Sequence, residues 1–215
     1  MIKLFGYWRS SASYRVRIAL ALKGIDYDYI PVNLRGGEQK SDQHLARNSQ
    51  GFVPVLELED GTQITQSIAI IDYLDAAYDG PKLIPDQPVA KAKVLSAALI
   101  IASDIAPIQN LSVINTLKSR FDTDNAQTAE WAQHWISNGF GALEKTAVQR
   151  ETSYLYTQRP ALFETCLIPQ IYNARRFGVD MSAFPALLDI DARCLSLAAF
   201  KEAAPENQID SPRTA

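Results

Sequence analysis

Three serines and three arginines surround a predicted helix start close to the N-terminus. The segment WRSSAS at positions 8–13 lies between a strand-like run and a helix-like run. A helix N-terminus presents unpaired backbone N–H groups and the positive end of the helix dipole, so it favours an anion. The serine hydroxyls can donate to that anion, and Arg9, Arg15 and Arg17 add positive potential. The local pattern alone leaves two interpretations, an anion-binding site or a serine that only caps the helix.

The sequence lacks the residue patterns typical of metal-binding, nucleotide-binding, serine-hydrolase and nucleic-acid-binding proteins. The two histidines, His44 and His134, lie far apart without cysteine neighbours, so no metal site is expected. GxGxxG, Walker A and GxSxG motifs are absent, which leaves nucleotide-binding and serine-hydrolase functions without their usual signatures. The 21 basic and 24 acidic residues give a net charge of −3 without a basic tail, so nucleic-acid binding is not expected.

The first 80 or so residues, which must position the serine segment, alternate between strand-like and helix-like patterns. The expected elements are, in order, a strand at 2–7, a helix at 14–23 stopped by Gly24, a strand at 27–34, a hairpin at 53–58 and 63–65, and a helix at 68–78 capped by Ser67. This order predicts one small α/β domain with a mixed sheet.

Pro54 lies at the start of an expected strand, where proline cannot donate to a central ladder. One resolution is a cis peptide bond between Val53 and Pro54, because cis bonds occur almost only before proline. That bond would turn the Val53 backbone outward as an edge that can bind a ligand.

From about residue 86 the pattern is helical throughout. Helices are expected over 89–118 with an interruption at Pro107, and then over 128–148, 161–177 and 185–203. The linker LIPDQP holds two prolines within six residues, which indicates a domain boundary near 80–88. The expected domains are therefore 1–82 and an all-helical 88–215.

Location is indicated by two negative features. The longest run of low polarity, residues 94–103, is far shorter than the roughly 18 residues of a membrane helix, and positions 1–11 lack the apolar core of a signal peptide. Cys166 and Cys194 cannot make a disulfide framework. A reducing cytoplasm is the expected setting.

Taken over its whole length, the chain resembles the zeta class of the cytosolic glutathione transferases, whose members include maleylacetoacetate isomerase. The stretches that carry the resemblance are WRSSASYRVRIALALKGIDYDYIPVNL at 8–34, GGEQ at 36–39, VPVL at 53–56, QSIAIIDYLD at 66–75, IQNLS at 108–112, WISNGFGALE at 135–144, CLIPQIYNARRFGVD at 166–180 and APENQ at 204–208. The resemblance implies a thioredoxin-like N-terminal domain followed by an all-α domain, and a homodimer.

The resemblance also implies glutathione as the cofactor. It assigns the Ser10 hydroxyl to the glutathione sulfur and Val53 to the backbone of the cysteinyl part, whereas Tyr7 lies near the catalytic tyrosine of other classes. The implied cofactor-binding residues are Ser10, Ser11, Ala12, Gln39, Val53, Gln66, Ser67, Asn110, Leu111 and Ser112.

The implied reaction is the cis–trans isomerisation of maleylacetoacetate to fumarylacetoacetate by reversible addition of the glutathione thiolate. The catalytic residues would be Ser10, Ser11, Arg9 and Arg176, and the substrate carboxylate would meet Arg9, Arg175 or Arg176. Without the resemblance, Arg175 and Arg176 are typical of a solvated helix C-terminus.

Three alanines depart from the family pattern. Ala12 replaces a cysteine of many members, so the sulfur must come from glutathione. Ala106 replaces a frequent Gln or His, and Ala161 replaces a helix-capping Thr or Ser, although Glu164 can still satisfy a backbone donor. The open alternatives are a maleylpyruvate isomerase, a glutathione transferase acting on small α-halo acids, and a non-catalytic glutathione-fold binding protein.

Overall fold

The chain forms two compact units in a computed structural model that describes residues 1–212. The first unit contains Met1–Leu83 together with the segment that begins at Leu195, and the second unit is Ile84–Cys194. The first break falls inside the expected linker. Residues 195–212 belong by packing to the first unit, although the sequence placed them with the helices. The division into functional domains at 1–82 and 88–215 stays a prediction.

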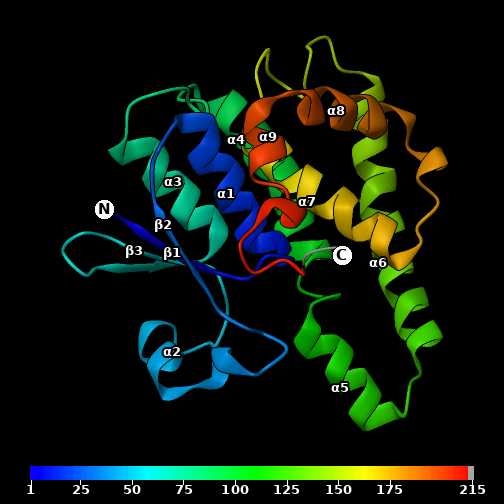
Figure 1. The fold of residues 1–215 in the computed structure, drawn as a ribbon. Coiled ribbons are helices and arrows are strands. Elements are labelled where there is room, and N and C mark those ends of the chain that lie inside the picture. Colours follow the sequence, from blue (N-terminus) through cyan, green and yellow to red (C-terminus); the bar gives the residue numbers. More distant parts are fainter. Residues whose placement is uncertain (213–215) are drawn as a thin grey trace. The chain divides into compact units, whose positions relative to one another are not determined.

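The first unit is built on a four-stranded mixed sheet in the order β2-β1-β3-β4 (Figure 1). The strands are β1 (Lys3–Gly6), β2 (Asp28–Pro31), β3 (Val55–Glu57) and β4 (Gln63–Thr65). β1 pairs in parallel with β2 and antiparallel with β3, and β3 and β4 form the expected hairpin. The Val53–Pro54 peptide bond is cis. The predicted thioredoxin-like α/β fold is thereby confirmed.

The helices of the first unit pack on one another. They are α1 (Ser11–Lys23), α2 (Asp42–Arg47), α3 (Ser67–Ala77) and α9 (Ala198–Glu202), with short 3-10 turns η1 (Glu38–Lys40) and η4 (Pro205–Asn207). α1 contacts both α3 and α9, and α3 also packs on β4. It ends where predicted, because Gly24 adopts φ 64°, a left-handed conformation that closes the helix.

The second unit is helical. Its elements are α4 (Pro88–Leu99), the π-helical turn η2 (Ile100–Ile105), α5 (Leu111–Phe121), α6 (Asn125–Val148), α7 (Leu162–Phe177), the 3-10 turn η3 (Met181–Ala183) and α8 (Pro185–Ser196), whose last residues belong to the first unit. The helix expected over 89–118 is interrupted around Pro107 as predicted, between η2 and α5, whereas the π turn at 100–105 was not expected. Gly139 of α6 allows the π turn to approach, since a Cβ there would lie 2.3 Å from Ile105 Cδ1.

α7 begins at a buried carboxylate. Ala161 at the N-cap offers no side-chain acceptor, but Glu164 accepts hydrogen bonds from the N–H groups of Ala161 at 2.9 Å and Leu155 at 3.0 Å. The expected compensation by Glu164 is confirmed. Burial raises the pKa of Glu164 from 4.5 to about 7, against the opposing effect of the two backbone hydrogen bonds.

Stability is expected to fall as the pH rises from about 5 to about 7. In that window the unfolded Glu164 is ionised while the folded Glu164 still binds a proton, so the folded state loses up to about 3 kcal/mol relative to the unfolded state. Urea unfolding of the wild type and of Glu164→Gln at a series of pH values measures this. The variant should have a flatter profile, and equal slopes would contradict the raised pKa.

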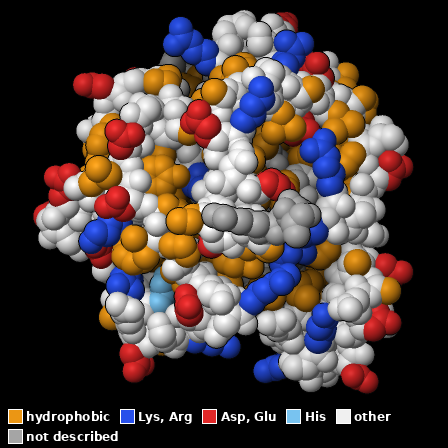
Figure 2. All heavy atoms as spheres, in the orientation of Figure 1, with side chains coloured by type: hydrophobic (Ala, Val, Ile, Leu, Met, Phe, Trp, Pro, Cys, Tyr) orange, Lys and Arg blue, Asp and Glu red, His pale blue; other side chains and the backbone are white. Residues whose placement is uncertain are grey.

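The surface carries charge of both signs. On the face seen in Figure 2, basic and acidic side chains are interspersed rather than gathered by sign. Among residues 1–212, no helix combines the length and the apolar character needed to cross a bilayer.

Candidate active site

A tight turn carries Ser10 to the start of α1. We call residues 7–10 the serine turn; it is closed by a hydrogen bond from the Ser10 N–H to the Tyr7 carbonyl at 3.0 Å. Ser10 is the N-cap of α1, and its Oγ accepts from the Ser13 N–H at 3.2 Å. A hydroxyl accepts and donates at once, so capping leaves the Ser10 proton available to an anion. The two interpretations of the sequence are therefore compatible.

The residues after Ser10 divide into two groups. Ser11 and Ala12 are half-buried in the first turn of α1, where backbone N–H groups have no acceptor within the helix. Ser13, by contrast, is fully buried, and its Oγ accepts from the Tyr7 N–H at 3.4 Å. Ser13 therefore serves the fold of the serine turn, whereas Ser10, Ser11 and Ala12 present polar groups that can meet a ligand.

The start of α3 forms a second polar cluster. Ser67 is its first residue, and its Oγ accepts from Arg15 Nη1 at 3.3 Å; both side chains are buried. Gln66 before it has φ 68° and ψ 115°, a strained conformation for a residue with a Cβ, which occurs mostly at functional sites. Gln66 Nε2 also donates to Gln50 Oε1 at 2.9 Å. These contacts of Arg15 and Gln50 were not predicted from the sequence.

Sheet register brings these segments to one edge. Phe5 of β1 lies opposite Val55 of β3, and Val55 lies opposite Thr65 of β4. The serine turn, Val53 and the start of α3 therefore leave the sheet at the same end. Gln39, in η1, has a buried Oε1 without a hydrogen-bond partner among the described residues. Two helix N-termini and an unpartnered amide oxygen fit a peptide-like, anionic cofactor such as glutathione.

Asn110 and Ser112 lie in the second unit, at the start of α5. Asn110 is the N-cap, and its Oδ1 accepts from the N–H groups of Ser112 at 2.9 Å and Val113 at 3.1 Å, and from the Ser112 hydroxyl at 2.6 Å. The two predicted residues are thus joined to each other, and their part in cofactor binding stays a prediction.

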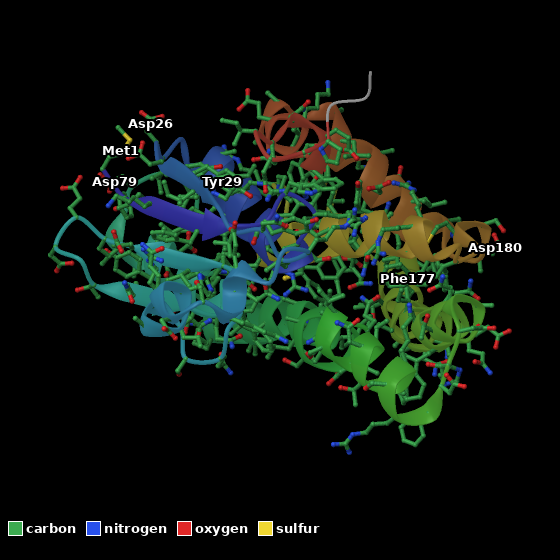
Figure 3. The ribbon with its side chains drawn as sticks, turned by 60° about the horizontal axis from the view of Figure 1, so that its bottom comes forward. Met1, Asp26, Tyr29, Asp79, Phe177 and Asp180 are labelled. Carbon is green, nitrogen blue, oxygen red and sulfur yellow. The ribbon has the colours of Figure 1, made fainter. Side chains whose placement is uncertain are left out.

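The arginine pair near the end of α7 has divergent partners; Figure 3 labels the neighbouring Phe177 and Asp180. Arg175 Nη2 lies 2.6 Å from Asp191 Oδ2, and the Asp191 side chain is 3% exposed. Burial raises the pKa of Asp191, and Arg175 opposes that rise. Arg175 therefore compensates a buried carboxylate in the structure, and its part in substrate binding stays a prediction.

Arg176 ends a chain of amide side chains. Its Nε and Nη2 donate to Asn173 Oδ1 at 3.0 and 2.6 Å. Asn173 Nδ2 donates to Gln109 Oε1 at 2.9 Å, and Gln109 Nε2 donates to Gln170 Oε1 at 2.8 Å. Gln109 and Gln170 are buried, so this series of amide side chains links Arg176 to the interior of the second unit. This network was not visible in the sequence.

Comparison with known proteins agrees with the geometry of both units. Residues 1–76 match the family described as Glutathione S-transferase, N-terminal domain. The maleylacetoacetate isomerase of Rhizobium meliloti (strain 1021) is 43% identical over 204 residues, which are 94% of this chain and 95% of the relative. This chain belongs to the maleylacetoacetate isomerase family, the zeta class of the glutathione transferases.

Solved structures of relatives, some of them with bound ligands, have the same fold as this chain. A holo maleylpyruvate isomerase, described as a bacterial zeta-class glutathione transferase, has a TM-score of 0.95 and 38% identity over 98% of this chain and all of its own. The maleylacetoacetate isomerase of Methylobacterium extorquens AM1, solved with bound malonate and glutathione, has a TM-score of 0.94 and 33% identity over 98% of this chain and 99% of its own.

The family assignment leaves the roles of individual residues as predictions. Of the predicted cofactor-binding residues, the first unit holds Ser10, Ser11, Ala12, Gln39, Val53, Gln66 and Ser67, and the second holds Asn110, Leu111 and Ser112. Arg9 lies beside the Trp8 ring, 5.3 Å from its centroid. Within residues 1–212, no cluster of three or more His, Cys, Asp or Glu side chains is arranged to hold a metal ion.

The two arginines are expected to respond differently to replacement. Arg176→Ala should raise the KM for a maleyl acid by about tenfold or more, because a charge-assisted hydrogen bond to the substrate is lost, and should lower the Tm less than Arg175→Ala does. Arg175→Ala should lower stability by about 2 kcal/mol, because Asp191 loses its partner. Steady-state kinetics and thermal unfolding of both variants measure this, and a larger KM effect from Arg175→Ala would reverse the assignment.

Proposed function

We propose that this protein is a glutathione-dependent isomerase that converts maleylacetoacetate to fumarylacetoacetate. The observation that carries the proposal is the Ser10 hydroxyl, which caps α1 through its oxygen and keeps its proton for an anion at the helix N-terminus. The identity of about 40% to maleylacetoacetate isomerases over nearly the whole chain supports the same activity.

The residues of the first unit would prepare the cofactor. When bound, glutathione supplies a thiolate that adds reversibly to the cis double bond, which becomes free to rotate. Ser10 donates to the sulfur, and the first N–H groups of α1 add positive potential, so both lower the pKa of the thiol from its usual value of about 8.5. Gln66 and Ser67 would hold the γ-glutamyl carboxylate at the start of α3. Ala12 is no obstacle, because the reacting sulfur belongs to glutathione.

Arginines would bind the organic substrate. Arg176, held by Asn173, and Arg9, beside Trp8, supply guanidinium groups that pair with carboxylates in two parallel hydrogen bonds. Either guanidinium, taken by itself, would orient the diketo acid and stabilise the negative charge that develops on it. The malonate bound with glutathione in the Methylobacterium extorquens relative is a dicarboxylate, as this role requires.

Maleylpyruvate is a second candidate substrate. A maleylpyruvate isomerase of Ralstonia is 39% identical over its whole length, close to the figures for the maleylacetoacetate isomerases. Both compounds present a cis double bond between a carboxylate and a carbonyl group, so the same residues can serve either reaction.

An absorbance assay with each maleyl acid, with and without glutathione, tests the proposal. We expect isomerisation that depends on glutathione and falls about 100-fold in Ser10→Ala, with Ser13→Ala, in the first turn of α1, as the matched control. Activity without glutathione would overturn the mechanism. Chloride release from dichloroacetate without isomerisation would identify a transferase of α-halo acids, and glutathione binding without any turnover would identify a binding protein.

We also propose a homodimer in the cytoplasm. Large apolar side chains are exposed on both units of the single chain, namely Leu45, Phe52, Leu111 and Phe121, the last with 70% of its surface exposed. Burial against a second copy would cover them. Both cysteines are free and buried, which suits a reducing compartment rich in glutathione. Sedimentation that shows only a monomer at micromolar concentration would contradict the dimer.

A further inference from the structure

The C-terminal segment of the first unit is fastened to the serine turn. In Figure 1 this segment, coloured orange to red, passes beside the N-terminal end of α1. Asp210 Oδ2 accepts a hydrogen bond from the Trp8 N–H at 2.9 Å. Trp8 is two positions before Ser10, so a side chain from position 210 reaches directly into the turn that presents the predicted catalytic serine.

The other side of the Trp8 residue is held by α1. Arg17 Nη2 donates to the Trp8 carbonyl at 2.9 Å, and Arg17 Nε donates to the Ala203 carbonyl at 3.0 Å. Ala203 is the C-cap of α9, where the helix dipole favours a cation. One guanidinium therefore ties both the serine turn and the C-terminal segment to α1.

Burial makes these contacts costly to break. Arg17 is fully buried, and its guanidinium carbon lies 5.2 Å from the Tyr14 ring centroid and 6.0 Å from that of Tyr29. Tyr29, on β2 (Figure 3), donates its hydroxyl to Asp210 Oδ2 at 3.4 Å. The Tyr14 hydroxyl donates to the Phe200 carbonyl at 3.4 Å. The segment is thus fixed at positions 200, 203 and 210.

We propose that Asp210 is a positioning residue for the glutathione site. Its carboxylate holds the N–H of Trp8, and through the closed serine turn it fixes the direction of the Ser10 hydroxyl and of the first N–H groups of α1. A shift of Trp8 moves Ser10 directly, because Tyr7 and Ser10 are joined across the turn. The inference rests on the proposed function of Ser10, and it gives Asp210 a role that acts through Trp8.

Asp210 could affect the glutathione thiol through its negative charge or through its hydrogen bond to Trp8, and the two effects predict opposite changes in the thiol pKa when Asp210 is replaced. A negative charge near the bound thiol would raise the pKa of the thiol, so its removal would lower that pKa. Loss of the acceptor would loosen the serine turn and raise the pKa. Asp210→Asn removes the charge but keeps an oxygen that can accept from Trp8, whereas Asp210→Ala removes both. The charged and titratable groups that face Asp210, Arg17 of α1 and Tyr29 of β2, stay in both variants.

The test compares Asp210→Ala, Asp210→Asn and a neighbouring control, Ile209→Ala, whose native side chain is 80% exposed. Hydrogen exchange of the Trp8 amide is measured without glutathione. The Kd for glutathione is measured by calorimetry, and the pKa of the bound thiol by the ultraviolet absorbance of its thiolate. For Asp210→Ala we expect faster Trp8 exchange, a Kd raised about tenfold and a raised thiol pKa. Asp210→Asn should stay within about threefold of the wild-type Kd, and Ile209→Ala should not differ from wild type.

Two results would overturn the positioning role. In the first, Asp210→Ala matches Ile209→Ala in both Trp8 exchange and glutathione affinity. In the second, both Asp210 variants lower the thiol pKa, which would assign the effect to charge. A wild-type protein that binds no glutathione would instead overturn the proposed function, so the two failures are distinguishable.

Discussion

Replacement of Ser10 by alanine is expected to lower kcat/KM for the maleyl acid about 100-fold. The Ser10 hydroxyl would donate its one proton to the negatively charged sulfur of glutathione. Removal of one such donor lowers kcat about 10²- to 10³-fold in comparable sites. The same change removes the N-cap of α1, which costs about 1 kcal/mol of stability. The pH profile of kcat/KM should move to higher pH, because less of the bound thiol is ionised.

Two neighbouring variants separate the catalytic effect from the structural one. Ser10→Thr keeps a hydroxyl that can cap and donate, so it should retain most of the activity. Ser13→Ala removes a fully buried hydroxyl that accepts from the Tyr7 N–H, so it should lower the Tm and should move the pH profile less than Ser10→Ala does. Equal losses of activity from Ser10→Ala and Ser13→Ala would show that the wrong hydroxyl has been assigned to the sulfur.

Replacement of Asp75 by alanine is expected to lower the free energy of unfolding by about 3–5 kcal/mol. Lys23 Nζ lies 3.1 Å from Asp75 Oδ1, and these side chains are 0% and 5% exposed. Asp75 also accepts the Leu83 N–H through both oxygens, at 3.1 and 2.9 Å. Its loss leaves a buried ammonium without its carboxylate and a buried N–H without an acceptor. Urea unfolding of the variant measures the effect.

An exposed ion pair of the same unit provides the control. Lys3 Nζ lies 2.9 Å from Glu57 Oε1, with 45% and 18% of the side chains exposed, so Glu57→Ala should cost no more than about 1 kcal/mol. The double variant Lys23→Met with Asp75→Asn should recover much of the loss, because it leaves no unpaired charge and keeps an acceptor for Leu83. A cost for Asp75→Ala as small as that for Glu57→Ala would show that water reaches Lys23.

The elements of the first unit could be predicted because local signals agreed there. Gly24 stops α1, Ser67 starts α3, and the turn at Gly61 joins two short strands, each within one residue or two of its expected place. α2 was missed because its capping contact, from the His44 N–H to Ser41 Oγ, stands in a polar stretch without an apolar period. In the second unit the break at η2 was missed, because a π turn depends on packing between Ile105 and Gly139 rather than on a local signal.

Some features of the candidate site could likewise be predicted from the sequence, and others could not. Ser10 was visible as a helix cap. Ser67 was expected to cap α3, but it is the first residue of that helix and Gln66 is the N-cap. The resemblance supplied the rest of the predicted set. The contacts that hold these residues were not visible, because Arg15 with Ser67, Gln109 with Asn173, and Asp210 with Trp8 join positions more than 50 residues apart. Side-chain pairing over such distances leaves no periodic trace in a single sequence.

The first unit is discontinuous in sequence, and this has a consequence for its biosynthesis. A ribosome completes the sheet and α3 by Leu83, but Phe200, Ala203 and Asp210, which pack on α1 and the serine turn, emerge more than 100 residues later. At about 5–20 residues per second this delay lasts several seconds or more, during which Ile84–Cys194 can fold. During this time Arg17 lacks the Ala203 carbonyl as its acceptor, and α1 lacks the C-terminal segment that packs on it. We expect chaperones to bind the nascent N-terminal unit at this stage.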